Sequence, residues 1–151
     1  MDVHFYHQPD GNHFYSEGDP TTMETDASSP VVRRANETEY ESVAAADGLA
    51  KCVLLAESDG MPTFAMRRFT LDPGAVVPKH VNEVEHGQYV LEGSYIVGID
   101  DEEYQVTSGD SLYIPAGTVH WYRNDAATSG AFLCIVPNGN DEIQIVETDE
   151  V

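Results

Sequence analysis

The most informative stretch of the sequence reads GDSLYIPAGTVHWYRN and covers residues 109–124. Its aromatic and β-branched residues predict two short strands, over 111–114 and 118–123. Between them, Pro115-Ala116-Gly117 predicts a tight turn, and Ser108-Gly109-Asp110 predicts another turn before the first strand. The stretch is therefore typical of a β protein built from short strands.

The same alternation of strands and turns extends on both sides of this stretch. Ten strands within about 100 residues must close into a barrel or a two-sheet jelly roll, because open sheets leave unpaired edges. We predict an all-β domain over 48–147, an N-terminal arm over 1–47 with a helical turn or two within 37–47, and a tail over 148–151. The predicted strands are 50–56, 63–71, 76–81, 86–91, 94–99, 103–107, 111–114, 118–123, 130–136 and 142–147, with a turn at Asp72-Pro73-Gly74 between the second and the third.

The charge of the chain is extreme, with 27 acidic and 7 basic residues and a formal net charge of −20. The acidic residues are spread along the chain, as in salt-adapted archaeal proteins; the alternative is an ordinary acidic soluble protein. We expect no nucleic-acid or anionic membrane partner, because little positive charge is present to neutralise phosphates. The sequence has no apolar run long enough to span a membrane and no signal-peptide pattern, so we expect a cytoplasmic protein.

Two cysteines, Cys52 and Cys134, lie in apolar runs that we predict to be strands. Neither has a partner at metal-ligand spacing. We therefore expect two buried thiols that behave as small apolar side chains, which is compatible with a reducing cytoplasm.

Three of the six histidines lie in the predicted strand region, at positions 80, 86 and 120. His80 and Asn82 share one face of a strand, and a fold of the chain over 83–85 would bring His86 to them. Converging imidazoles suit a divalent transition metal, although a histidine in a strand is more often an ordinary core or surface residue. The weaker candidates are the arm residues His4, His7 and His13, since a loosely ordered segment rarely preorganises a metal site.

Two segments, 74–93 and 109–124, resemble the conserved motifs of the cupin superfamily. The second segment matches at every fixed position: Gly109, Pro115-Ala-Gly117, His120 and Asn124. The family's first motif, G-x5-H-x-H-x3,4-E-x6-G, reads here as G-x5-H-x-N-x3-H-x6-G. The resemblance covers about residues 48–138 and implies a single cupin β-barrel, which is a double-stranded β-helix or jelly roll.

Two positions depart from the family's first motif: Asn82 replaces the second histidine, and His86 replaces the glutamate. The run over 80–86 resembles small cupins with an H-x-H-P-W-E-H segment, in which a histidine at the glutamate position is a ligand. The resemblance thus implies metal ligation by His80, His86 and His120. Asn82 is a weak neutral ligand, a hydrogen-bond partner of bound water, or the mark of a weakened site.

Three neutral imidazoles would leave the full charge on a divalent metal, which lowers the pKa of bound water and attracts an anionic or enolisable substrate. Such cupin sites are similar to those of thiol dioxygenases and some flavonol-type oxygenases. Iron or manganese is the expected occupant, and the ligand set leaves nickel, zinc and copper open.

Other side chains would shape the pocket around the histidines. Gln88 and Tyr122 share faces with candidate ligands, so they would contact substrate or orient a histidine, with ordinary packing as the alternative for Tyr122. Trp121 would point to the outer face or to a subunit interface. Arg67 and Arg68 are adjacent, so at most one faces inside as an anion clamp, and an exposed ion pair is the favoured interpretation.

Three functions are compatible with this pattern, because one fold hosts many activities. The first is a divalent-metal-dependent enzyme of dioxygenase, isomerase or lyase type that acts on a small oxygenated metabolite. The second is a non-catalytic cupin that binds a small molecule or a metal, and the third is a degenerate cupin that serves as an interaction module. The retained histidines favour the first over the third. The resemblance also implies a homodimer.

Overall fold

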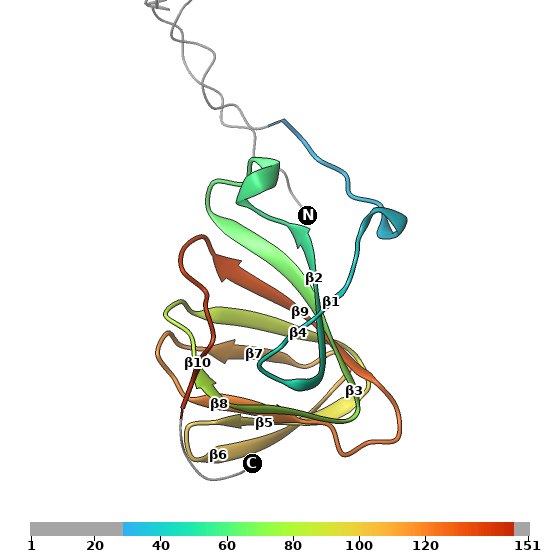
Figure 1. The fold of residues 1–151 in the computed structure, drawn as a ribbon, viewed down its shortest axis with the longest axis vertical. Coiled ribbons are helices and arrows are strands. Elements are labelled where there is room, and N and C mark those ends of the chain that lie inside the picture. The colour runs from blue at the N-terminus through green and yellow to red at the C-terminus, as the bar shows by residue number, and fades with distance from the viewer. Residues whose placement is uncertain (1–28, 147–151) are drawn as a thin grey trace, which may run out of the picture.

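The computed structural model describes residues 29–146, which form a strongly curled antiparallel sheet (Figure 1). Helical structure among these residues consists of two 3-10 turns, Ala35–Glu37 and Glu57–Asp59, and neither has the length that a membrane crossing requires. In chain order the strands are β1 (Glu41–Ser42), β2 (Asp47–Leu55), β3 (Phe64–Val81), β4 (His86–Glu92), β5 (Ser94–Ile99), β6 (Glu102–Thr107), β7 (Ser111–Ile114), β8 (His120–Arg123), β9 (Gly130–Pro137) and β10 (Gln144–Ile145).

Strand β3 is the central element of the sheet. The main path of paired strands runs β6-β5-β8-β3-β9-β4-β7, and β2 and β10 also pair with β3. The first part of β3 pairs with β2 and β9, whereas its last residues pair with β8 and β10. One long strand thereby joins the two parts of the curled sheet, and the all-β jelly-roll prediction is confirmed.

The predicted turn at Asp72-Pro73-Gly74 is wrong as a break between strands, because β3 runs through it. Gly74 adopts φ +82, a left-handed conformation that favours glycine, and its N–H bonds to the carbonyl of Asn124 at 2.8 Å. The Asn124 side chain donates to the Leu71 carbonyl at 3.1 Å. The turn residues therefore make a corner within a continuous strand, which is where β3 changes its partners.

The predicted strands over 94–99 and 111–114 agree with β5 and β7 at both ends. The last predicted strand, 142–147, is reduced to Gln144–Ile145 within the described residues, and the strand predicted from 118 begins at His120. The other predicted strands shift by a few residues at their ends, since pairing partners rather than local composition set where a strand stops.

The helical turn predicted within 37–47 is wrong. A 3-10 turn lies just before it, and strand β1 instead pairs with β2 through Ser42 and Ala50. The Val43 N–H also bonds to the Leu49 carbonyl at 2.9 Å. This pairing satisfies the hydrogen-bonding groups of the backbone in an extended conformation. Tertiary structure therefore overrides the local preference for a helix. Residues 1–28, with most of the predicted arm, lie outside the described residues, as does the tail.

The core lies inside the curl, where alternate residues of each strand point inward. Leu71, Val90 and Val97 are fully buried there. Cys52 and Cys134 are also fully buried and carry no disulfide, as predicted. A continuous apolar interior therefore surrounds the few polar side chains that the sheet also points inward.

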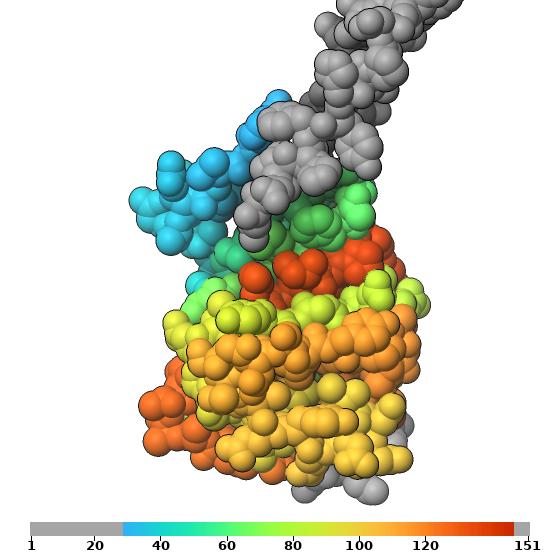
Figure 2. All heavy atoms as spheres, turned by 180° about the vertical axis from the view of Figure 1, so that it is seen from behind, coloured from blue at the N-terminus to red at the C-terminus, as the bar shows by residue number. Residues whose placement is uncertain are grey.

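Trp121 does not lie exposed on an outer face, because the chain covers it. The residue is 6% exposed and is the register partner of Gly98, where a Cβ atom would lie 2.0 Å from the indole. The guanidinium of Arg123 covers the ring at 5.4 Å. Exposed aromatic side chains include Tyr104 on β6 and Tyr113 on β7. These two strands form part of the face of the molecule shown in Figure 2.

Candidate functional site

A cavity of about 490 Å³ lies inside the curled sheet. Part of its lining is apolar: Leu49, Phe69, Val77 and Phe132. The polar part of its lining is Arg67, His80, Asn82, His86, Gln88, His120, Tyr122, Cys134 and Asp141. A cavity of this size, with an apolar wall and a few convergent polar groups, has the character of a small-molecule site.

Six of the residues that the sequence suggested for the site line this cavity, and their strands explain why; the weaker candidates His4, His7 and His13 lie outside the described residues. His80 on β3 and His120 on β8 are register partners, which places their ring centroids 4.1 Å apart. His86 opens β4, and its ring centroid lies 6.0 Å from that of His120. The remaining members are Asn82, Gln88 and Tyr122.

His80 and His120 share one arrangement: the Nδ1 atom bonds to a backbone carbonyl two residues earlier. The distances are 2.7 Å from His80 to the Pro78 oxygen and 2.9 Å from His120 to the Thr118 oxygen. A carbonyl only accepts, so Nδ1 carries the proton and Nε2 keeps its lone pair. Burial lowers the pKa of His80, and burial together with the neighbouring His80 lowers the pKa of His120 to about 3. Both imidazoles are thus neutral at neutral pH.

Asn82 follows β3 directly and lines the same cavity. Its Nδ2 donates weakly to the backbone carbonyls of Asp141 and Glu142, both at 3.5 Å. Its Oδ1 is buried and has no hydrogen-bond partner, and neither has the buried Nε2 of His120. Two buried lone pairs without a donor are therefore available to a cation or to a ligand's N–H or O–H group.

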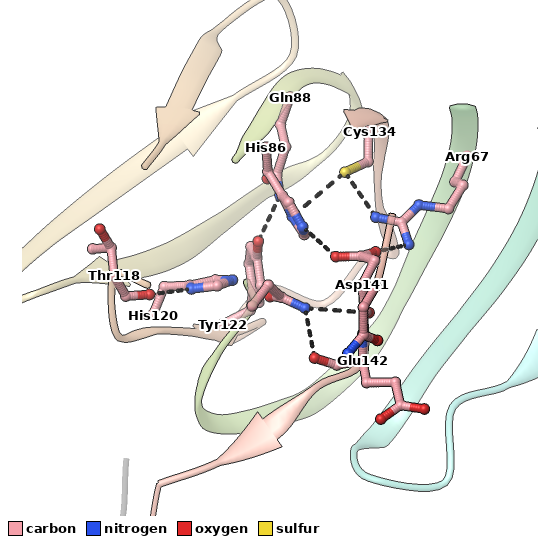
Figure 3. A network of polar contacts seen from close by, with 11 residues as sticks. Arg67, His86, Gln88, Thr118, His120, Tyr122, Cys134, Asp141 and Glu142 are labelled. Atoms are coloured by element: carbon pink, nitrogen blue, oxygen red, sulfur yellow. Dashed lines mark hydrogen bonds and ion pairs between the residues drawn. The ribbon is translucent and has the colours of Figure 1, made fainter. Parts of the chain in front are cut away.

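His86 is held in a different way, by charged partners (Figure 3). Its Nε2 bonds to Asp141 Oδ1 at 2.8 Å, and its Nδ1 lies 3.7 Å from Cys134 Sγ. Asp141 also forms an ion pair with Arg67. Burial opposes the charged form of His86, but the hydrogen bonds to Asp141 and Cys134 outweigh it and raise the pKa of His86 to about 9. His86 is therefore a cation at neutral pH in this arrangement.

Cys134 belongs to this charged cluster and is not simply an apolar filler. Its sulfur also accepts from the Arg67 guanidinium at 3.5 Å. Burial by itself raises the pKa of the Cys134 thiol, but the neighbouring His86 and Arg67 lower it below its ordinary value. The same two cations hold the pKa of the Asp141 carboxyl below its usual range against the effect of burial.

Gln88 and Tyr122 both line the cavity and form a hydrogen bond with each other. The Gln88 amide donates to the Tyr122 hydroxyl at 2.7 Å, and burial raises the pKa of Tyr122 far above its ordinary value. The phenol ring stacks on Phe132 with centroids 5.4 Å apart. Tyr122 therefore packs in the core and also presents a fixed hydroxyl, and the buried Oε1 of Gln88 has no partner.

Sequence reasoning missed Asp141 and misjudged Arg67. Alternation along β3 puts Arg67 on the inward face with Phe69 and Leu71, and the exposed pair that we expected belongs instead to Arg68, which donates to Glu92 at 3.0 Å. The inward position of Arg67 could have been predicted from the two-residue alternation of side chains along a strand. Nothing in the local pattern marks Asp141, since it follows β9 in a segment without regular structure.

The donor atoms fit a divalent transition metal in part. The Nε2 atoms of His80 and His120 and the Oδ1 of Asn82 are neutral ligand atoms on residues that line one cavity. The third imidazole, His86, is engaged on both nitrogens, and residues 29–146 contain no group of three or more His, Cys, Asp or Glu side chains arranged to hold a metal. The structure thus brings the predicted ligands to one cavity but leaves His86 paired with Asp141.

A family model described as "Cupin domain" matches residues 67–136. The chain is 33% identical over 61 residues to the uncharacterized protein MJ1618 of Methanocaldococcus jannaschii, which covers 39% of this chain and 49% of that protein. It is 45% identical over 51 residues to the quercetin 2,3-dioxygenase of Bacillus subtilis, which covers 33% of this chain and 15% of the enzyme. The chain therefore spans half or less of the length of these relatives.

A solved structure with similar architecture is the polyketide cyclase RemF from Streptomyces resistomycificus. The two chains are 27% identical with a TM-score of 0.70, and the match covers 81% of this chain and 87% of that chain. The similarity extends over most of both chains, so it includes the curled sheet that surrounds the cavity.

Proposed function

The chain belongs to the cupin superfamily, and we propose that it is a divalent-metal-dependent cupin enzyme that acts on a small oxygenated metabolite. The observation that carries the proposal is the pair of buried lone pairs, on His120 and Asn82, that have no hydrogen-bond partner. A buried acceptor without a donor is costly, by about 1–3 kcal/mol, and a cation bound there would remove that cost. The similarity to a quercetin 2,3-dioxygenase supports oxygenase-type chemistry.

The metal would be held by His80, His120 and Asn82, with iron or manganese as the favoured occupant. Both histidines are neutral, as ligation requires, and the bond from each Nδ1 to a carbonyl fixes the ring and its tautomer. His86 would be a further ligand if separated from Asp141. A bound metal would supply Lewis-acid chemistry toward substrate oxygens.

The remaining wall of the cavity binds and orients the substrate. The Tyr122 hydroxyl and the unpartnered Gln88 Oε1 supply polar groups, and Leu49 and Phe132 supply apolar surface. A substrate that carries both oxygen atoms and a hydrocarbon body matches this lining.

A second candidate is a cupin that binds a small molecule without turnover. The observation that favours it is the pairing of His86 with Asp141, which leaves two rather than three imidazoles free for a metal. In this case the cavity would take the same class of ligand, and no metal would be retained.

Metal content per chain separates the two candidates. The protein is purified at high salt without chelator or a metal affinity column, and metals are quantified by mass spectrometry in the wild type and in His120→Ala. The proposal expects about one equivalent of iron or manganese in the wild type and an affinity at least about 100-fold weaker in the variant, the upper range for loss of a supporting group. The matched control replaces His4, His7 and His13 with alanine and retains the metal. Absence of metal from the wild type after reconstitution would overturn the enzyme proposal.

A further inference from the structure

The cavity holds the buried arginine of a strongly acidic chain. Among the described residues, Arg67 is the only lysine or arginine that is buried, with 9% of its surface exposed. Lys51 lines the same cavity, and so do the carboxylates of Asp141 and Glu142. A chain with a net charge of −20 thus places two of its seven basic side chains at one pocket, together with two acidic ones.

The hydrogen-bonding capacity of Arg67 is only partly used. One terminal nitrogen donates to Asp141, and the other donates to the sulfur of Cys134 at 3.5 Å, which is a weak acceptor. The Nε atom is buried and has no partner. Because a guanidinium binds carboxylates best through two parallel N–H groups, Arg67 keeps an unfilled donor toward an anionic partner.

The carboxylate that now holds Arg67 comes from a segment that the strands do not fix. Residues 139–143 have no strand pairing; Asn138 before them bonds to the Thr63 carbonyl at 2.9 Å, and Gln144 after them pairs with Val81. Gly139 adopts φ +146, a conformation that L side chains rarely adopt. Side-chain bonds also hold the segment: Asn82 donates to its carbonyls at 3.5 Å, and Asn140 donates to Glu83 at 3.3 Å. Withdrawal of Asp141 would break these bonds and its contacts to Arg67 and His86, while the backbone bonds at both ends of the segment stay in place.

We propose that Asp141 is an internal stand-in for a ligand carboxylate, and that the cavity binds a small monocarboxylic acid with an apolar body. The ligand carboxylate replaces Asp141 on Arg67 and His86. This inference rests on the proposed function in that the same cavity is used, and it names the class of substrate. Displacement of the segment would release His86 Nε2, the nitrogen that Asp141 now occupies, to the ligand carboxylate.

The apolar part of the cavity lining fits the rest of such a ligand. Phe69 and Phe132 stack with ring centroids 5.1 Å apart, and Leu49 and Val77 complete the apolar wall. Arg67 lies over the Phe69 ring at 5.3 Å, so the cationic and apolar regions adjoin. A carboxylate attached to a ring or short alkyl chain would contact both regions at once.

Binding of 3-phenylpropanoate to metal-free protein tests the inference, with the neutral 3-phenylpropanamide as its isostere. Calorimetry should show that the acid binds at least about tenfold more tightly than the amide, since a charge-assisted bidentate contact distinguishes them. Asp141→Asn removes the competing carboxylate and should tighten acid binding by about tenfold or more. The matched control is Asp125→Asn, which removes the same charge from an exposed pair with Arg123 and should leave binding unchanged.

Arg67→Gln should abolish the preference for the acid, and Arg67→Lys should restore part of it. If the Arg67 variants do not fold, the comparison of acid with amide and the Asp141→Asn result still decide the question. Equal binding of acid and amide, or an unchanged affinity in Asp141→Asn, overturns the inference. The test uses chelated protein, so its outcome does not depend on a metal. Acid binding, together with absence of metal from the wild type after reconstitution, would refute the enzyme proposal and leave the ligand class standing.

Discussion

The two sides of the cavity hold histidines in opposite charge states. On one side, His80 and His120 donate to backbone carbonyls, and burial keeps both rings neutral. On the other side, His86 faces Asp141, and its pKa rises to about 9. The difference teaches that the partner of the ring decides its charge: a backbone carbonyl leaves a buried imidazole neutral, whereas a carboxylate stabilises the imidazolium cation.

The largest expected effect comes from removal of the buried ion pair between Arg67 and Asp141, on the charged side of the cavity. Arg67→Gln should destabilise the protein by about 3 kcal/mol, because it leaves the carboxylate of Asp141 in a largely buried place without its arginine. Arg68→Gln, which removes an exposed pair with Glu92, should cost less than about 1 kcal/mol. Urea unfolding of metal-free protein measures both values, and similar losses for the two neighbours would contradict the assignment of Arg67 as the buried ion-pair member.

The next effect concerns the two neutral histidines, His80 and His120, and the dependence of protein stability on pH. Because the folded state holds the pKa of His80 and His120 below 6.5, the unfolded chain binds more protons and stability falls as pH decreases below 6.5. The slope is up to about 1.4 kcal/mol per pH unit for each ring. Unfolding free energies of metal-free protein at pH 6.5 and pH 5 should show this loss, and His120→Gln should reduce it. An identical slope in the variant would mean that His120 is not the titrating group.

The smallest expected effect is on the alkaline side and has the opposite sign. The folded pKa of His86 lies above 6.5, so its stabilising contribution is complete below pH 6.5 and is lost as pH rises through about 9. Stability should therefore decrease between pH 7 and pH 9, by up to about 1.4 kcal/mol per pH unit. Thermal unfolding in this range should show the decrease, and Asp141→Asn should flatten it. A decrease of equal size in Asp141→Asn would show that another group causes it.

Much of the fold could be predicted because its signals are local. Gly109, the Pro115-Ala-Gly117 turn and the alternating strands each depend on short-range chemistry, so most strands were placed within a few residues. The exceptions have a common cause. The corner at Gly74 and the pairing of β1 depend on partners distant in the sequence, which no local window contains.

The candidate site could be predicted only where it follows the alternation of strands. His80, Asn82 and His120 line one cavity because they occupy inward positions, and this follows from a period of two. Asp141 has no such signal, since it lies outside any strand and reaches the cavity from an irregular segment.

The amino-acid sequence by itself determined the β architecture and the set of inward-facing histidines, because turns and alternation are local properties of the chain. Only the tertiary structure decided which histidine is neutral and which is charged. The decisive partners, the Thr118 carbonyl for His120 and Asp141 for His86, differ in charge, and the second comes from a distant segment of the chain. The pKa of a buried group depends on what surrounds it in space, and that is settled by folding.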